Sequence, residues 1–436
     1  MLRNVATVAL IALASTGCAL YNEVSVVPLR ITPTNIERGA DLPSMIRKAD
    51  YLRAIELGPA AEARPRRSAE ELGAIGSAFL AAGRLDDARS ILRNALDAGP
   101  RGNTYAEIAW DLSQVEYLAN NYDLSLEWAQ LAYERGLQIR QWHLDYLEAL
   151  SSVPVYRFSG RATERLPFKY GRPDVPRIAT KINGTHEVEG IIDSGAVLSI
   201  VSQRLANRLP IRRFGEFEGT FYGLLGEPIQ VRFGLIEKLE LQDMVIENVP
   251  VAIMPDEKMR FLISKNEGKE FHMDFLLGSN LLKEFRLELN FDRRSVTFTR
   301  LTEADRRPGP DQNLFFHGFR PHVRAAVNDR AWFLFILDTG SEITFLNQSR
   351  LGILPVRQFG GAHSATLQGL GGAMKHGAKL ENVQVGVDEW GGRFRTIPMY
   401  SSDENETAVG IIGQNFLGNF NVVIDFGRMR VDLRRR

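Results

Sequence analysis

Hydrophobic residues recur at two different spacings in two parts of this chain. From Ala69 to Leu150 they recur every three or four residues, and Pro100 is the only proline of the stretch, which predicts a block of amphipathic helices. After Ser151, short runs rich in valine, isoleucine, leucine and phenylalanine alternate with glycine and proline, which predicts strands and turns. We therefore expect a multidomain protein, with an α-helical block followed by all-β structure.

One stretch of the helical block resembles the tetratricopeptide repeat (TPR), and a weaker copy follows it. Small residues in the signature would let paired helices approach closely. Two repeats are fewer than such arrays usually need, so a helix expected around Leu42–Leu57, or docking on the rest of the chain, should complete the block. An unrelated pair of helical hairpins is the alternative. The signature residues are Leu72, Ile75, Gly76, Phe79, Ala88, Leu92, Ala95 and Pro100, and those of the weaker copy are Ala109, Leu112, Ser113, Ser125, Ala129 and Ala132.

Residues 1–18 have the layout of a secretory signal peptide. Arg3 precedes an apolar run from Val5 to Ala14 that is too short to span a bilayer, and small residues lead from there to Cys18. The run Ser15–Cys18 resembles the lipobox of bacterial lipoproteins, although Ser15 stands where leucine is usual. A cleaved signal peptide with an incidental cysteine is the alternative.

The lipobox resemblance implies that Cys18 is lipidated and becomes the mature N-terminus. Ala19 after the cysteine favours the outer membrane. The protein is then expected on the periplasmic side of the cell envelope, held to the membrane by its lipid anchor only.

Charge and cysteine content narrow the function classes. The 53 basic and 53 acidic side chains cancel, so the broad basic field needed for non-specific nucleic-acid binding is absent and no nucleic-acid partner is expected. The single cysteine excludes a disulfide framework and a thiolate metal cluster.

The β-rich region contains an internal duplication. Shifted by 145 residues, the separation between Asp193 and Asp338, the second part matches the first without a gap over about 40 residues. The run Ile191-Ile192-Asp193-Ser194-Gly195 falls on Ile336-Leu337-Asp338-Thr339-Gly340.

The match returns near the end of each copy at an offset of 135 residues, the separation between Gly278 and Gly413. Leu277-Gly278-x-Asn280-Leu281-Leu282 then falls on Ile412-Gly413-x-Asn415-Phe416-Leu417. The two parts are therefore two copies of one half-domain.

The duplicated pattern consists of two apolar residues, Asp-Ser/Thr-Gly, and a distal apolar-apolar-Gly run. It resembles the clan of aspartic proteases that includes pepsin and the retroviral proteases, from about residue 155 to 436. The resemblance implies two retropepsin-like half-domains that form a pseudo-twofold unit. In this family two nearby carboxylates share a proton and activate a water molecule, because both cannot ionise at that distance.

The family resemblance assigns roles to the duplicated residues. Asp193 and Asp338 would be the catalytic pair and would titrate together. Ser194 and Thr339 would brace the two loops against each other, while Gly195 and Gly340 allow tight turns. The runs Leu276-Leu277-Gly278 and Ile411-Ile412-Gly413 would pack beneath the loops.

The resemblance also implies flaps that close over a bound peptide, at corresponding distances in the two copies. Ordinary hairpin turns are the alternative for either segment. The candidate residues are Tyr222, Gly223 and Gly226 in the first copy and Gly369, Gly371 and Gly372 in the second.

Each half is close in scale to a retroviral protease subunit, so we expect the active pair to form within one chain. Pairing in trans between two molecules is the alternative. The charged stretch Pro255–Glu270, present only in the first half, is expected to be a solvated loop, with a lid or a self-cleavage site as alternatives.

The expected domains follow from these boundaries. They are a signal peptide at 1–18, an N-terminal segment and linker at 19–68, a TPR-like domain at 69–150, a first half-domain at 151–302, and a linker with the second half-domain at 303–436.

The leading functional hypothesis is an aspartic-type endopeptidase that acts on polypeptides, with the TPR-like helices recruiting a substrate or a regulator. The alternative is a non-catalytic, protease-like lipoprotein that binds peptides or serves as a scaffold. The intact aspartates favour catalysis, because a binding module has no need of two carboxylates that repel each other. No zinc-protease, serine-hydrolase or phosphate-loop motif is found, and no cofactor or metal is expected. His317 and His322, the closest pair of histidines, are expected in a surface loop.

Overall fold

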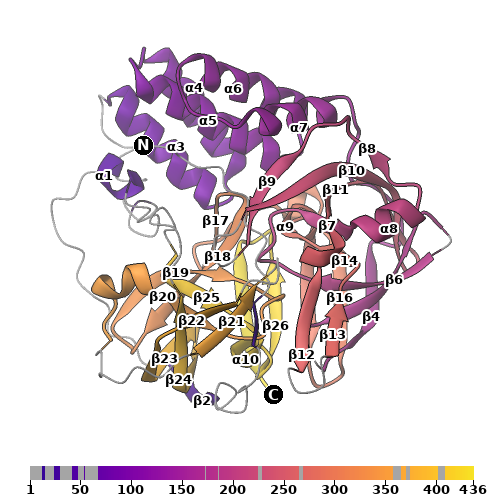
Figure 1. Cartoon of the computed structure of the whole chain (residues 1–436). Coiled ribbons are helices and arrows are strands. Elements are labelled where there is room, and N and C mark those ends of the chain that lie inside the picture. The colour runs from indigo at the N-terminus through magenta and orange to yellow at the C-terminus, as the bar shows by residue number, and fades with distance from the viewer. Residues whose placement is uncertain are drawn as a thin grey trace. The chain divides into compact units, whose positions relative to one another are not determined.

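The computed structural model of the chain describes residues 12–14, 24–29, 42–47, 54, 67–171, 173–184, 186–223, 228–264, 269–356, 365–369, 374–400 and 408–436 (Figure 1). These residues divide into two compact units. The helical unit contains the described parts of Thr34–Val155 together with Phe315–Phe319, and the β-rich unit contains those of Ala6–Pro33, Tyr156–Leu314 and Arg320–Arg436.

The helical unit confirms the helical block expected from Ala69 onward. A capping box begins α3, where the Ser68 hydroxyl accepts from the Glu71 amide and the Glu71 carboxylate accepts from the Ser68 amide. A Cβ at Gly76 would lie 2.5 Å from Leu92 Cδ2, so only glycine permits this approach of α3 and α4. The TPR assignment itself stays a prediction. The helices are α1 (Leu42–Arg47), α3 (Ala69–Ala81), α4 (Leu85–Asp97), α5 (Asn103–Leu118), α6 (Tyr122–Glu134) and α7 (Gln141–Ser151).

The segment Phe315–Phe319, from strand β17 (Leu314–His317) and the turn after it, also belongs to the helical unit. Phe319 has a left-handed backbone, with φ of 64°, and its ring lies 4.5 Å from that of Tyr117 and 6.3 Å from that of His143. The ring of Trp110 also belongs to this cluster and lies 6.4 Å from that of Phe319. Burial in this aromatic cluster lowers the pKa of His143 to about 4.

The first half of the β-rich unit is built from β-strands and two short helices. Strand β14 lies between β6 and β7, and it pairs in parallel with β6 and antiparallel with β7. The strands are β3 (Arg157–Gly160), β4 (Thr163–Lys169), β5 (Arg177–Ile182), β6 (His186–Ile192), β7 (Ser199–Ser202), β8 (Arg212–Arg213), β9 (Gly219–Tyr222), β10 (Pro228–Leu241), β11 (Met244–Met254), β12 (Arg260–Ser264), β13 (Lys269–His272), β14 (Phe275–Leu277), β15 (Phe285–Asn290) and β16 (Ser295–Arg300), with helices α8 (Gln203–Arg208) and α9 (Ser279–Leu282) and the 3-10 turn η2 (Asp256–Lys258).

The second half repeats the first in its strand order. β25 pairs in parallel with β19 and antiparallel with β20, as β14 does with β6 and β7. The elements are η3 (Glu303–Asp305), β17 (Leu314–His317), β18 (Arg320–Val327), β19 (Ala331–Leu337), β20 (Phe345–Asn347), η4 (Gln348–Ile353), β21 (Ala365–Gly369), β22 (Met374–Gly377), β23 (Lys379–Val387), β24 (Trp390–Tyr400), β25 (Gly410–Ile412), α10 (Gln414–Leu417), β26 (Phe420–Asp425) and β27 (Arg430–Arg435). Two N-terminal strands, β1 (Ala12–Ala14) and β2 (Val24–Pro28), pair with β21 and β24 respectively.

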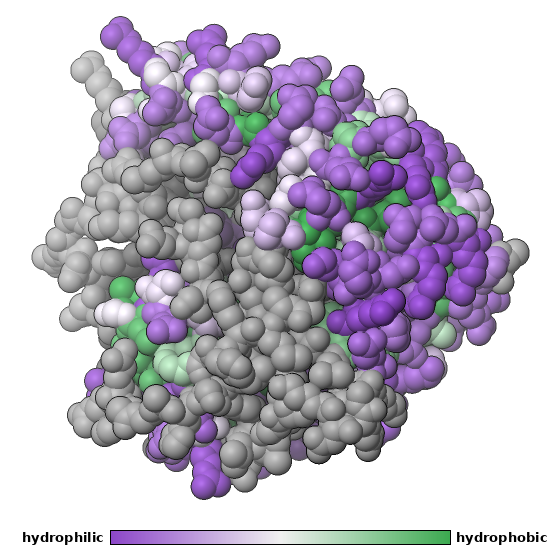
Figure 2. All heavy atoms as spheres, in the orientation of Figure 1, coloured by the Kyte–Doolittle hydropathy of each residue, from purple (hydrophilic) through white to green (hydrophobic). Residues whose placement is uncertain are grey.

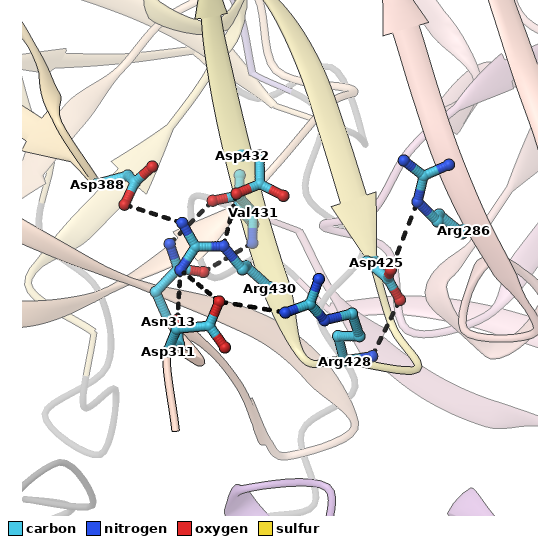
Figure 3. A network of polar contacts seen from close by, with 9 residues as sticks. All are labelled: Arg286, Asp311, Asn313, Asp388, Asp425, Arg428, Arg430, Val431 and Asp432. Carbon is cyan, nitrogen blue, oxygen red and sulfur yellow. Dashed lines mark hydrogen bonds and ion pairs between the residues drawn. The ribbon is translucent and has the colours of Figure 1, made fainter. Parts of the chain in front are cut away.

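One sheet joins the two halves within the chain, in the order β4-β16-β15-β26-β27. At its centre β15 pairs antiparallel with β26, and the ion pair Arg286–Asp425 joins these two strands at 3.5 Å. Figure 3 shows this pair beside a second cluster, in which Arg430 of β27 contacts Asp432 and Asp388.

Two sequence expectations about loops are wrong. The charged stretch Pro255–Glu270 contains β12 and the start of β13, which form a hairpin with Phe261 buried beneath it, so its described part is not a solvated loop. His322 lies fully buried on β18 rather than in a surface loop, because β18 pairs with β19 and His322 lies opposite Ile336 within the sheet.

On the face shown in Figure 2, hydrophilic residues predominate over α4 and α6 of the helical unit. In the β-rich unit they predominate over α8 and β8, with small hydrophobic areas among them. None of the helices described here combines the length and the apolar character needed to cross a membrane.

Candidate active site

The two Asp-Ser/Thr-Gly loops follow equivalent strands. Asp193 comes directly after β6, and its amide donates to the Leu277 carbonyl at 3.0 Å. Asp338 comes directly after β19, and its amide donates to the Ile412 carbonyl at 3.1 Å. Each loop is therefore fixed to the distal apolar run of its own half, as the duplication predicts.

Four hydrogen bonds cross between the two loops. The Ser194 amide donates to Thr339 Oγ1 at 3.0 Å, and the Thr339 amide donates to Ser194 Oγ at 3.1 Å. The Ser194 hydroxyl donates to the Leu337 carbonyl and the Thr339 hydroxyl to the Ile192 carbonyl, each at 2.7 Å. Each hydroxyl thus accepts from one residue of the other loop and donates to another.

The glycines of the two loops lie against the opposite carboxyl groups. A Cβ at Gly195 would lie 2.5 Å from Asp338 Cγ, and a Cβ at Gly340 would lie 2.7 Å from Asp193 Oδ2. Because any side chain here would overlap a carboxyl group, these glycines permit the two aspartates to approach each other.

A second pair of matched contacts lies beneath the loops. The Gly278 amide donates to Ser199 Oγ, and the Gly413 amide donates to Thr344 Oγ1, both at 3.0 Å. The Ser199 amide donates to Asn280 Oδ1 at 2.7 Å. In the second half the Thr344 amide donates to Asn415 Oδ1, also at 2.7 Å.

These supporting residues were not assigned a role from the sequence. The signal was present, because the duplication aligns Ser199 with Thr344 and Asn280 with Asn415. Both copies have a polar residue at the same position of an otherwise apolar run, and this could have identified the supporting residues.

Both carboxyl groups are fully buried and lie within hydrogen-bonding reach of each other. Burial raises the pKa of Asp193 to about 7, opposed by hydrogen bonds from Asp338 and from the amides of Ala196 and Gly195. Burial, followed by the charge of Asp193, raises the pKa of Asp338 well above its usual range. The pair therefore retains a proton at a pH where two separate aspartates would both be ionised.

The inner oxygens of the pair are held by amides of their own loops. Asp193 Oδ1 accepts from the Gly195 and Ala196 amides at 2.9 and 3.1 Å, and Asp338 Oδ1 accepts from the Gly340 amide at 2.9 Å. Apart from the opposite carboxyl group, no group of the described residues donates a hydrogen bond to either Oδ2. The Oδ2 atoms are thus the ones left to accept from or donate to a reactant.

The flap candidates lie partly outside the described residues. Tyr222 ends β9, which pairs with β10 as a hairpin, and Gly223 follows it. Gly369 ends β21, which pairs with β22. Gly226, Gly371 and Gly372, as well as Cys18, lie outside the described residues. The hairpins are thus present, while their closure over a peptide stays a prediction.

An extended segment of the chain itself pairs with the second flap candidate. Ala12, Leu13 and Ala14 lie opposite Gly369, Gln368 and Leu367 in an antiparallel register. Strand β21 is thus paired through its main chain with an extended segment of the same chain.

Among the residues described, no group of three or more His, Cys, Asp or Glu side chains is placed to hold a metal ion.

Comparison with known proteins agrees with this geometry in the first half. Residues 178–281, which include Asp193 and the run ending at Gly278, match the sequence model of a family described as "Aspartyl protease". This match supports the resemblance to aspartic proteases.

Among solved structures, the chain is similar to a retropepsin-like aspartic protease from Rickettsia conorii. The two are 13% identical with a TM-score of 0.21, over 33% of this chain and 95% of that one. No curated protein matches this chain.

Proposed function

We propose that this protein is an aspartic endopeptidase whose catalytic pair is Asp193 and Asp338. The observation that carries the proposal is the crossed arrangement of the two loops, in which each glycine lies against the carboxyl group of the other half. The matched hydroxyl contacts of Ser194 and Thr339 support it, because they hold the two loops together through main-chain groups and involve neither carboxyl group.

The reaction needs one water molecule and a pair carrying one proton. The ionised carboxyl takes a proton from the water while the oxygen of the water attacks the scissile carbonyl carbon. The protonated carboxyl donates to the carbonyl oxygen and stabilises the developing negative charge. The carboxyl that took the proton from the water then transfers it to the amide nitrogen, and the C–N bond breaks. The raised pKa values keep one proton on the pair while this occurs.

We also propose that both aspartates act within one chain, as a pseudo-twofold unit of two retropepsin-like half-domains. The pairing of β15 with β26 and the contacts of Ser194 with Thr339 support this, since they join the halves of a single chain.

Cleavage of a denatured protein mixture between pH 4 and 9 tests the proposal, with Asp193→Asn and Asp338→Asn as variants. Each variant should abolish cleavage while keeping the wild-type circular dichroism spectrum. An equimolar mixture of the two variants should stay inactive, because neither chain has an intact pair. Cleavage by either variant would contradict the paired mechanism, and recovery in the mixture would show pairing in trans.

Peptide binding without cleavage is the second candidate. The proposed mature chain begins at Cys18 and lacks β1, which would leave the edge of β21 that β1 occupies open to an extended peptide. A folded wild-type protein that binds extended peptides but cleaves none at any pH would favour it.

We further propose that Cys18 is lipidated and anchors the protein on the periplasmic side of the envelope, and that TPR-like helices recruit a substrate or a regulator. Labelled palmitate should be incorporated into the wild type but not into Cys18→Ser. Deletion of residues 69–150 should impair cleavage of a natural substrate more than that of a denatured protein; equal cleavage would contradict recruitment.

A further inference from the structure

The N-terminal strand β2 lies along the outer edge of the second half. Val24 pairs with Phe394 and Pro28 with Trp390 in an antiparallel register, and the Leu29 amide donates to the Glu389 carbonyl at 2.9 Å. Figure 1 shows β2 beside β24, although more than 360 residues separate them in the sequence.

The first half has a strand in the same place. There β3 pairs antiparallel with the start of β11, with Gly160 opposite Met244 directly after the β10–β11 turn. In the second half, Pro28 lies opposite Trp390 directly after the β23–β24 turn. Strand β2 thus occupies in the second half the position that β3 occupies in the first.

The second half does not form this strand from its own sequence. β3 directly precedes β4 in the chain, but the residues 145 positions after β3 form the 3-10 turn η3. The half therefore has an edge that its own duplicated sequence does not cover.

Three glycines on the β23–β24 hairpin make room for β2. A Cβ at Gly392 would lie 2.8 Å from both Val24 Cγ1 and Phe416 Cδ2, and one at Gly386 would overlap Leu29. A Cβ at Gly391 would lie 3.1 Å from Gln384 Nε2 and 3.3 Å from Val27 Cγ2. The equivalent residues of the first half carry side chains: Ile246, Val245 and Glu240. The glycines are therefore specific to the edge that receives β2.

Contacts continue from this edge toward Asp338. β24 pairs with β20, β20 pairs with β25, and Ile412 of β25 lies opposite Leu337, directly before Asp338. Arg430 also donates to Asp388 at 3.2 Å and so fixes the turn that precedes Trp390 (Figure 3).

We infer that residues Val24–Leu29 are the first strand of the second half-domain, supplied by the N-terminus, and that the protease is active only while this strand occupies the edge of β24. The segment binds by strand addition, in which main-chain hydrogen bonds give affinity and the glycines select the side chains. Loss of the strand from this edge switches the second half off. The dependence of activity on the strand rests on the proposed function, whereas the binding of the strand does not.

The test uses the full chain with a site for a specific protease inserted between residues 30 and 41. After cutting and removal of the N-terminal fragment under mild denaturation, a labelled peptide of residues 22–31 is added. We expect saturable binding, recovery of the wild-type melting temperature, and recovery of at least half of the lost cleavage. A peptide with Val24→Asp and Val27→Asp serves as the control and should bind at least tenfold more weakly.

The uncut variant Val24→Asp/Val27→Asp provides a second measurement that does not depend on refolding. It should speed hydrogen exchange of the Leu29 amide at least tenfold, with Ser25→Asp, at an exposed position of the same strand, as control. No binding of the peptide together with unchanged Leu29 exchange in Val24→Asp/Val27→Asp would overturn the inference. Binding of the strand by a protein that cleaves nothing would leave the strand assignment standing and refute the proposed function instead. Full cleavage after removal of the strand would overturn the switch.

Discussion

Gly195 of the first half lies directly against the carboxyl group of Asp338 in the second half, so that a Cβ at this glycine would fall 2.5 Å from Asp338 Cγ. The approach of the two aspartates thus depends on a missing side chain in the opposite loop. Gly340 has the reciprocal relationship with Asp193.

Gly195→Ala and Gly340→Ala should each lower kcat/KM at least 100-fold, because the added methyl group forces the carboxyl groups apart. Gly352→Ala is the matched control, since its Cβ would meet no atom within 4 Å. Steady-state kinetics on one peptide substrate would measure this. Near-normal kcat/KM in both loop variants would contradict the crossed arrangement.

Removal of one bridging hydroxyl should weaken both the fold and the reaction. Thr339→Val leaves the Ser194 amide without its acceptor in a buried loop, at a cost of about 1–3 kcal/mol. Thr339→Ser should restore most of the stability in a urea titration because it keeps the hydroxyl. The double variant Ser194→Ala/Thr339→Val should lose less free energy of unfolding than the two single variants lose together. Strictly additive losses would argue against a shared bridge.

The buried aspartates should make stability fall as the pH rises. Asp193 has a pKa of about 7 in the folded protein and 3.8 as its ordinary value, so the folded state binds the extra proton between these limits. Stability is therefore highest below about pH 4 for this group and declines toward pH 7. Asp193→Asn should raise the melting temperature by several degrees at pH 8 and change it little at pH 4. Asp292, whose pKa is lowered by hydrogen bonds from Asn421 and Arg436, is the control and should show no such gain as Asp292→Asn.

The same titration should govern cleavage. One carboxyl group must be ionised to accept the proton of water, so activity should rise on the acid side with a pKa near 7 and be greater at pH 7.5 than at pH 4. A pH profile of kcat/KM on a short peptide, whose own fold cannot change, measures this. An optimum near pH 4 would contradict the raised pKa.

Phe319→Ala should destabilise the helical unit by about 3–5 kcal/mol, because it empties the aromatic cluster of Trp110, Tyr117 and His143. Tyr133→Ala, at a residue 49% exposed on α6, is the control. Thermal melting followed by tryptophan fluorescence would report the change. Equal melting of both variants would show that Phe319 does not hold the unit together.

The sequence predicted the parts of this protein that repeat or that have a regular period. Duplication located Asp193 and Asp338 and aligned the polar residues beneath them, because two copies under the same geometric demand retain the same residue types. Helical spacing located α3 to α7. The signature of a close helix pair at Gly76 corresponds to its approach to Leu92.

The features that the sequence did not predict depend on contacts between distant segments. Strand β2 has only five residues, and nothing within Val24–Pro28 indicates that its partner is β24. Phe319 likewise lies in the turn between β17 and β18, and the sequence of that turn gives no sign of the helices it contacts. The charged stretch that contains Phe261 and the segment at His322 were both predicted as loops, whereas the pairing of β12 with β13 and of β18 with β19 makes them strands.

The position of β2 also sets a timetable for biosynthesis. Val24 is made early, but its partner Phe394 follows 370 residues later, which at 5–20 residues per second is roughly 20–70 s. Exported as proposed, the chain emerges across the membrane in the same order, so the helices and the first half can form there from contacts nearby in the sequence while the valine-rich N-terminal segment still has no edge to join. The second half can be completed only after nearly the whole chain has been made, so a nascent or truncated chain holds an unfinished protease.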